Sequence, residues 1–128
     1  MPQYGILVYS PAPADPTAYS ADYLAALNDV PDQAKALGGK VLGGSYFPKQ
    51  RGFALESSTQ AMSVRGEQVR AATLIDSDLV VSAFYVVAAP SIEVAVQIAR
   101  LNPAARDGGV EVRPLFVPAN QVQDDYAD

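Results

Sequence analysis

The sequence predicts an α+β fold in which an antiparallel sheet is covered by two helices on one face. The expected elements run in the order strand, helix, two or three strands, helix, strand along the 128 residues, and that order suits a two-layer sandwich. The stretch 82–115 holds a complete strand, helix and strand, each with its own start and stop signals. Since no helix remains for the second face of this sheet, that face needs a partner or a ligand.

The first part of the chain is predicted to form a strand and a long helix. Residues 4–9 are an apolar run typical of a strand, and the prolines after it, up to Pro16, indicate a loop. Apolar residues at helical spacing predict a helix over 17–37, ended by Gly38-Gly39. Pro31 either kinks this helix or starts a new one. The apolar stripe continues across Pro31, which favours one kinked helix.

The middle of the chain is predicted to hold shorter elements. A second strand is expected over 40–47, and the glycines inside it mark a bulge or a close backbone approach. A loop over 48–58 precedes a third strand over 59–65, which ends in a turn at Gly66-Glu67. Residues 69–74 form either a short strand or an arm, and residues 75–79 are expected to be exposed.

The last part begins with a strand over 80–88, a nearly continuous apolar run that suits burial on both faces. Pro90 ends this strand, because proline has no N–H for a ladder. Ser91 can cap the helix that follows, and Asn102-Pro103 is expected to stop it. A closing strand is predicted over 110–117.

Alternation along the closing strand separates its side chains into two sets. Val110 and Val112 point to one face, and Glu111 and Arg113 point to the other. The valines suit the helix-covered side. A carboxylate and a guanidinium are therefore expected together on the open face, on what looks like a central strand.

Composition excludes several classes of function. The chain has neither cysteine nor histidine, which removes disulfides, thiol chemistry, Ser-His-Asp triads and the commonest metal ligand. A net charge of −5 argues against a nucleic-acid partner. The N-terminal residues lack the pattern of a signal peptide, and no apolar run approaches the ~20 residues that span a bilayer. We expect a cytoplasmic protein without a membrane partner, one domain over 1–117, and an acidic, mobile tail over 118–128.

Glu111 and Arg113 are the first candidate catalytic residues. The pair can orient a polar ligand, or Glu111 can accept a proton; alternatively the two form a structural ion pair at a dimer seam. Tyrosines are the second group, because a phenol can donate to a developing oxyanion or simply pack in a core or interface. By strand parity Tyr9 shares a face with Leu7, and Tyr85 shares one with Val81 and Val87. The tyrosines singled out are Tyr9, Tyr46 and Tyr85.

Several phrases together resemble the YCII-related (DGPF-type) family. They are NPAARDGGVEVRPL with AFYVV before it, YGILVYS, and GGKVLGGSYFP, so the resemblance covers roughly residues 3–117. It implies a ferredoxin-like α+β sandwich that pairs into a dimeric α+β barrel, with a small-molecule pocket between the sheet and the partner. It also implies lyase, dehydrohalogenase or isomerase chemistry on small aromatic or carbonyl-bearing compounds.

The chain departs from this family at its acid–base groups. Ser45 stands where the family commonly carries a glutamate, and Arg70 precedes residues 71–74, AATL, which replace DGPF. The family's aspartate and histidine are thus both absent. Asp76 and Asp78 are a weak metal signal, so we expect a solvated loop there and no metal or other cofactor.

Two functions follow from these observations. The first is a cofactor-independent enzyme of lyase, isomerase or cyclase type, suited to natural-product biosynthesis, which holds a reactive substrate while tyrosines and Arg113 polarise a carbonyl. The second is a non-catalytic binding or scaffolding module. The predicted site has Glu111, Arg113 and Tyr85 as catalytic groups, and its substrate-binding residues are Tyr9, Ser45, Tyr46 and Arg70.

Overall fold

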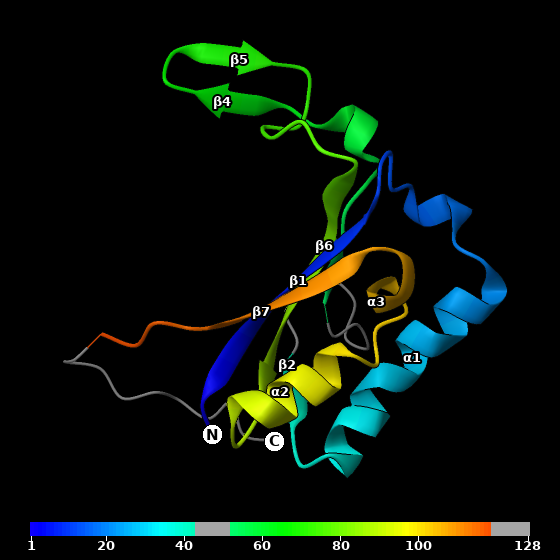
Figure 1. Cartoon of the computed structure of the whole chain (residues 1–128), viewed down its shortest axis with the longest axis vertical. Helices are drawn as coiled ribbons and strands as arrows, with labels where there is room; N and C mark the ends of the chain where they lie inside the picture. Colours follow the sequence, from blue (N-terminus) through cyan, green and yellow to red (C-terminus); the bar gives the residue numbers. More distant parts are fainter. Residues whose placement is uncertain (43–51, 119–128) are drawn as a thin grey trace.

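The computed structural model describes residues 1–42 and 52–118, and it has an α+β fold with a mostly antiparallel sheet (Figure 1). The helices are α1 (Ala21–Ala36), α2 (Ile92–Ala99) and α3 (Ala104–Asp107), with 3₁₀ turns η1 (Pro16–Ala18) and η2 (Ser58–Gln60). The strands are β1 (Gln3–Pro11), β2 (Lys40–Leu42), β3 (Phe53–Ala54), β4 (Ser63–Arg65), β5 (Gln68–Arg70), β6 (Leu79–Ala88) and β7 (Gly109–Pro114).

The main sheet is built around the long antiparallel pair of β1 and β6. In the described part of the chain its strands run in the order β2-β6-β1-β7, β3 pairs with β6 as well, and every pairing is antiparallel. Strand β7 therefore lies at an edge, and the expectation of a central strand was wrong. Alternation along a strand shows which of its two faces is covered, but it does not show whether the strand lies in the middle or at the edge of the sheet. An edge strand with one covered face therefore has the same alternation as a central strand with one covered face.

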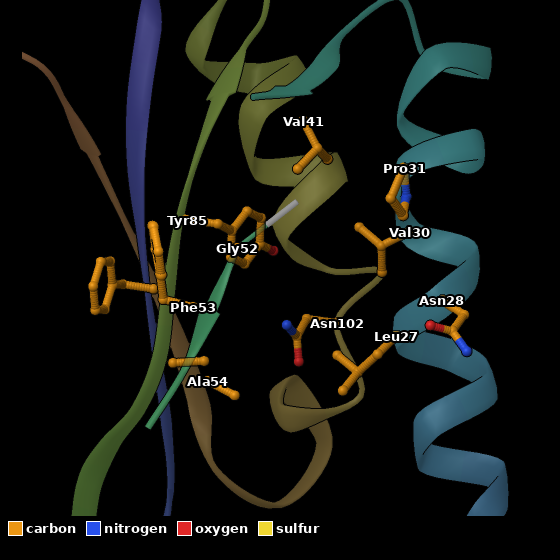
Figure 2. Close-up of a pocket in the computed structure, with 12 residues that line it drawn as sticks. Leu27, Asn28, Val30, Pro31, Val41, Gly52, Phe53, Ala54, Tyr85 and Asn102 are labelled. Carbon is orange, nitrogen blue, oxygen red and sulfur yellow. The ribbon is translucent and has the colours of Figure 1, made fainter. Parts of the chain in front are cut away.

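The core lies between one face of this sheet and the helices (Figures 1 and 2). Along β1, Tyr4, Ile6 and Val8 are buried, while the residues between them are only half-buried. Strand β6 adds Tyr85 and Val87 to the covered side. The helices add Val30, Ala34, Ala95, Ile98 and Ala99. Both long helices thus cover the same face, as predicted, and the described helices leave the second face open.

Helix α1 begins later than predicted but crosses the proline as expected. Residues 16–18 form η1 instead of its first turn, and the Ser20 hydroxyl accepts a 3.1 Å hydrogen bond from the Tyr23 N–H. This cap starts the helix at Ala21. The helix runs through Pro31 to Ala36, so one helix, and not two, spans this stretch.

The cap of α2 is confirmed, and its end is followed by a helix that was not predicted. The Ser91 hydroxyl accepts a 3.3 Å hydrogen bond from the Val94 N–H. Helix α2 ends at Ala99, earlier than the predicted stop. The Asn102 side-chain oxygen then accepts a 2.9 Å hydrogen bond from the Ala104 N–H, which starts the single turn α3. Asn102 thus follows one helix and accepts a hydrogen bond from the first residue of the next, whose cap position is taken by Pro103.

The middle of the chain differs most from expectation. Most of the strand predicted over 40–47 lies outside the described residues, and only its start is seen, as β2. Residues 53–54, predicted as loop, pair with β6 as β3. The strand predicted over 59–65 is shortened to β4 because η2 occupies its start. The turn at Gly66-Glu67 is confirmed, with Gly66 at a φ of +61°.

Strands β4 and β5 form a separate two-stranded sheet that projects from the body (Figure 1). This outcome matches the arm alternative predicted for 69–74. We call residues 62–75 the arm. None of the helices in the described ranges combines the length and the apolar character needed to cross a bilayer. The predicted acidic tail lies, beyond Pro118, outside the described residues.

Candidate functional site

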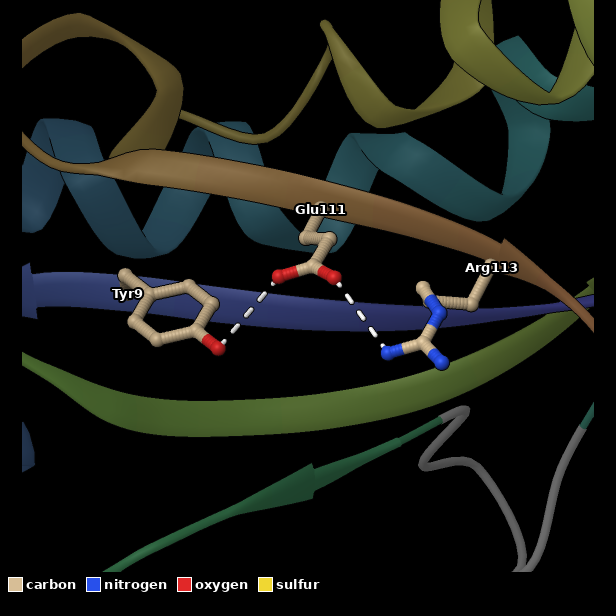
Figure 3. A network of polar contacts seen from close by, with 3 residues as sticks. All are labelled: Tyr9, Glu111 and Arg113. Carbon is tan, nitrogen blue, oxygen red and sulfur yellow. Dashed lines mark hydrogen bonds and ion pairs between the residues drawn. The ribbon is translucent and has the colours of Figure 1, made fainter.

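Tyr9, Glu111 and Arg113 meet on the open face of the sheet (Figure 3). The Tyr9 hydroxyl donates to Glu111 Oε1 over 3.5 Å, and Arg113 Nη1 donates to Glu111 Oε2 over 3.5 Å. The antiparallel register of β1 with β7 brings them together, since Tyr9 lies opposite Gly109 and Leu7 opposite Glu111. The sequence prediction that Glu111 and Arg113 share the uncovered face is confirmed.

The interactions within this open-face trio are weak in the single chain. The Arg113 and Glu111 side chains are 69% and 45% exposed. Exposed ion pairs with contacts of this length contribute about 0–1 kcal/mol because water and salt screen them. The trio therefore needs a cover before it can act as a buried polar site.

The trio is surrounded by apolar side chains that face solvent. The rings of Phe53 and Phe84 stack with centroids 5.1 Å apart, although each residue is 40% exposed. Val81 on β6 is 37% exposed, and Leu115, just after β7, is 41% exposed. We call this set, with Leu7 and the trio, the open face. Leu7 lies opposite Phe84, and Tyr9 opposite Val81, across the pair of β1 and β6. Exposed apolar side chains that gather in this way are typical of interaction surfaces.

Tyr85, the third predicted catalytic residue, lies on the opposite face of the sheet from the trio. It pairs with Ile6 across β1 and is 9% exposed. Its hydroxyl is buried, and no group in the described ranges 1–42 and 52–118 meets the geometry of a hydrogen bond to it, although the Asn102 amide lies nearby. The structure thus separates Tyr85 from Glu111 and Arg113, and the three do not form one constellation.

The Tyr85 side chain lines a cavity of about 260 Å³ between the sheet and α1 (Figure 2). This volume is slightly below that of most ligand pockets, which measure roughly 300–1,000 Å³, so the cavity suits a small molecule. We call it the Tyr85 cavity. Its walls are Leu27, Asn28, Val30 and Pro31 of α1, Val41 of β2, Gly52, Phe53 and Ala54, Ala83, Phe84 and Tyr85 of β6, and Asn102.

Besides Asn28 of α1, two polar side chains from the rest of the chain, Tyr85 and Asn102, line this mostly apolar space. Burial raises the pKa of the Tyr85 hydroxyl above its ordinary value of 10.0, and the Asn102 side chain offsets this in part. The phenol therefore stays protonated at neutral pH and can donate a hydrogen bond. Asn102 is 4% exposed; its oxygen is held by the Ala104 N–H, and Figure 2 shows its amide nitrogen on the side of Tyr85.

Helix α1 contributes its internal proline to the cavity wall. Leu27 and Pro31 both line the space and are four residues apart on the helix. Pro31 has no N–H, so it cannot make the usual helical hydrogen bond to the Leu27 carbonyl. The predicted helix interruption thus lies at the cavity.

The remaining predicted site residues do not join either group. Ser45 and Tyr46 lie outside the described residues. Arg70 is on the arm, where its guanidinium donates to the Thr73 and Leu74 carbonyls over 3.4 and 3.3 Å. Asn102 was missed as a site residue because the Asn-Pro pair was interpreted only as a helix stop.

The expected solvated loop is confirmed at Asp76 and Asp78, which are both exposed. Across the described ranges, no three His, Cys, Asp or Glu side chains gather closely enough to hold a metal ion.

Comparison of the sequence with models of known families and with curated proteins finds no match. The resemblance to the YCII-related family therefore stays a prediction that rests on the phrases quoted for it.

Proposed function

We propose that this chain is a divergent YCII-related protein with a ferredoxin-like sandwich, and that two copies pair through their open faces into a dimeric α+β barrel. The strand order β2-β6-β1-β7, with α1 following β1 and α2 following β6, supports this fold. The exposed apolar residues of the open face support the pairing, because burying them is the main free-energy gain available to that surface.

We further propose that the protein binds a small, neutral, carbonyl-bearing molecule in the Tyr85 cavity and acts on it without a metal or redox cofactor, as an isomerase, cyclase or lyase. One observation carries this proposal. A buried hydroxyl without a partner costs about 1–3 kcal/mol, and the Tyr85 hydroxyl is such a group at the wall of a cavity. A ligand oxygen would supply the missing acceptor.

The chemistry of the site is polarisation and positioning. The protonated Tyr85 hydroxyl donates to the carbonyl oxygen of the ligand and stabilises the negative charge that develops there. The mostly apolar walls lower the local dielectric, which strengthens this interaction. An α-proton of the ligand is then transferred to a water molecule at the mouth of the cavity, giving the enol or enolate from which isomerisation, cyclisation or elimination proceeds.

Glu111 and Arg113 belong to the proposed dimer seam. A second copy over the open face removes water from the trio, so the Glu111–Arg113 ion pair becomes stronger than in the single chain. In this arrangement the pair orients the two sheets, and the trio does not contact the ligand in the Tyr85 cavity.

Binding of two matched compounds tests the proposal. The bicyclic ketone α-tetralone carries one carbonyl oxygen, and tetralin has the same rings without it. By calorimetry, we expect the protein to prefer α-tetralone by about fivefold to tenfold, the worth of one hydrogen bond, and Tyr85→Phe to lose that preference. If neither compound binds, or the preference survives in Tyr85→Phe, the proposed site is wrong.

A non-catalytic binding module is the second candidate, favoured by one observation. Tyr85 is the only titratable side chain among the described residues that line the cavity. Deuterium exchange at the α-carbon of α-tetralone, followed by NMR, separates the two functions. Exchange faster than in buffer, and slowed in Tyr85→Phe, indicates catalysis. Binding with exchange at the buffer rate indicates the module.

A further inference from the structure

The arm exposes apolar side chains that nothing in the described chain covers. Val64 and Val69 lie directly opposite each other on β4 and β5, so they share one face of the hairpin, and they are 65% and 62% exposed. Arg65 and Gln68 are paired in the same ladder and point to the other face. The arm is therefore amphipathic, with its apolar face open to solvent. At its base Met62, Leu74 and Ile75 are 65%, 52% and 70% exposed.

An arm of this kind needs a partner to be stable. An isolated two-stranded hairpin is at best marginally stable in water. Strands β4 and β5 pair only with each other among the described strands, and Figure 1 shows them projecting beyond the main sheet. The usual solution for a two-stranded ribbon is to pack its apolar face on another surface.

The apolar side of the arm is continuous with the open face. A cleft of about 680 Å³ lies where the arm meets the body, and Val64 and Met62 line it on the arm side. Tyr9 and Val81 line it on the body side, and both also belong to the open face. A molecule that covers the open face is therefore placed to contact the arm as well.

A second copy of the chain fits as that molecule, because the open face that borders the arm across this cleft is the surface that the proposed pairing covers. In a twofold pair the arm and the open face of one copy meet the same surfaces of the other, so each surface is used twice.

We propose that the arm clasps a second copy of this chain, with Val64 and Val69 packed against the partner beside its open face. This inference rests on the pairing of open faces proposed above and adds to it the segment that holds the two copies together. The polar side of the arm, with Arg65 and Gln68, stays in solvent. The cleft at the base of the arm is then part of the dimer interface.

Analytical ultracentrifugation over a wide dilution series tests the inference with the double variant Val64→Ser/Val69→Ser. Each substitution acts twice in a symmetric dimer, so four buried valines are lost, and we expect the dimer Kd to rise on the order of 100-fold or more. Gln68→Ala, on the solvent side of the same arm, is the matched control, and Leu24→Ser on the outer surface of α1 is the second. Both should change Kd by less than about threefold.

Two results would overturn the inference: a wild-type chain that stays monomeric throughout the series, or a double variant whose Kd equals that of the wild type. A circular dichroism spectrum and melting curve of the double variant show whether its body is folded. Binding of α-tetralone, measured on the same samples, reports separately on the Tyr85 cavity. If the double variant loses the dimer but still binds α-tetralone, the arm inference is supported and the ligand proposal stands. If the double variant stays dimeric and α-tetralone does not bind, the arm inference and the ligand proposal are both overturned.

Discussion

Replacing Tyr85 by phenylalanine is expected to stabilise the ligand-free protein. The hydroxyl is the one buried side-chain polar atom without a partner in the described residues, and phenylalanine keeps the ring that packs in the core cluster. An unsatisfied buried polar group costs about 1–3 kcal/mol. Removing it should raise the free energy of unfolding by about 1 kcal/mol, the low end of that range, because the open cavity beside the ring gives the hydroxyl some freedom.

Urea denaturation, followed by circular dichroism at one fixed protein concentration, measures this change. A gain of about 1 kcal/mol moves the midpoint upward by about 0.5 M if m is about 2 kcal/mol/M. Tyr4→Phe is the matched control, because Tyr4 is a 6% exposed member of the same core cluster and its hydroxyl is not among the buried atoms without a partner in the described residues. Its midpoint should stay the same or fall slightly.

A midpoint that falls in Tyr85→Phe by the equivalent of 1 kcal/mol would refute the reasoning. Such a loss means that the hydroxyl already has a partner in the folded protein, for example a buried water in the cavity. The proposed hydrogen bond to a ligand carbonyl would then have to displace that partner and would add little affinity. A gain in stability together with a loss of ketone preference is the combination that the structure predicts.

Three further predictions follow from other parts of the structure. Glu111→Gln and Arg113→Ala should each change the unfolding free energy of the single chain by less than about 0.5 kcal/mol, because the pair is exposed; a larger loss in urea titrations of dilute protein would contradict this. The raised pKa of Tyr85 means that the folded state holds this proton more tightly than the unfolded state. The free energy of unfolding should therefore fall as the pH rises above 10.0. Urea midpoints measured across that pH range should fall less steeply in Tyr85→Phe than in the wild type. Ser91→Ala removes the hydroxyl that caps α2 and should cost about 1 kcal/mol, whereas Gly108→Ala, whose Cβ would collide with the Tyr9 carbonyl, should lower the melting temperature more than Ser91→Ala does.

Elements with strong local signals could be predicted from the sequence. Alternation along 110–113 placed Glu111 and Arg113 on the open face, because a strand with one covered face keeps its apolar residues on that side. The serine before the second helix was identified as its cap for an equally local reason: its hydroxyl serves an N–H three residues away. These inferences need no knowledge of distant parts of the chain.

The position of Tyr85 could not be predicted, because it depends on a bulge. The predicted strand over 80–88 is apolar at almost every position, so alternation does not show which of its side chains lie on the covered face. Parity placed Tyr85 with both Val81 and Val87. In the structure the register of β1 with β6 shifts after Val8, so Val81 points to the open face while Tyr85 and Val87 are buried. The shift arises from long-range pairing, which the local sequence does not report.

The cavity was missed for a related reason: each of its polar groups has a sufficient local explanation. Asn102 satisfies the start of α3, and Pro31 looked like a helix interruption. Only the long-range packing of the chain brings Asn102 and Pro31 to the walls of the same cavity as Tyr85. Strand β3 was missed because a strand of two residues is too short to show a periodic pattern. Its residues are extended because they pair with β6.

The separation of Tyr85 from the trio divides the predicted site into two parts that mutation can address independently. Residues on the open side of β1 and β7 bear on the proposed pairing, and residues on the covered side of β6 bear on the proposed ligand site, because a sheet prevents direct contact between side chains on its two faces. Phe84 connects them: it lines the Tyr85 cavity and also stacks on Phe53 at the open face. A ligand that moves the Phe53–Phe84 stack would therefore change the surface on which the second copy packs, which couples ligand binding to pairing through one aromatic pair.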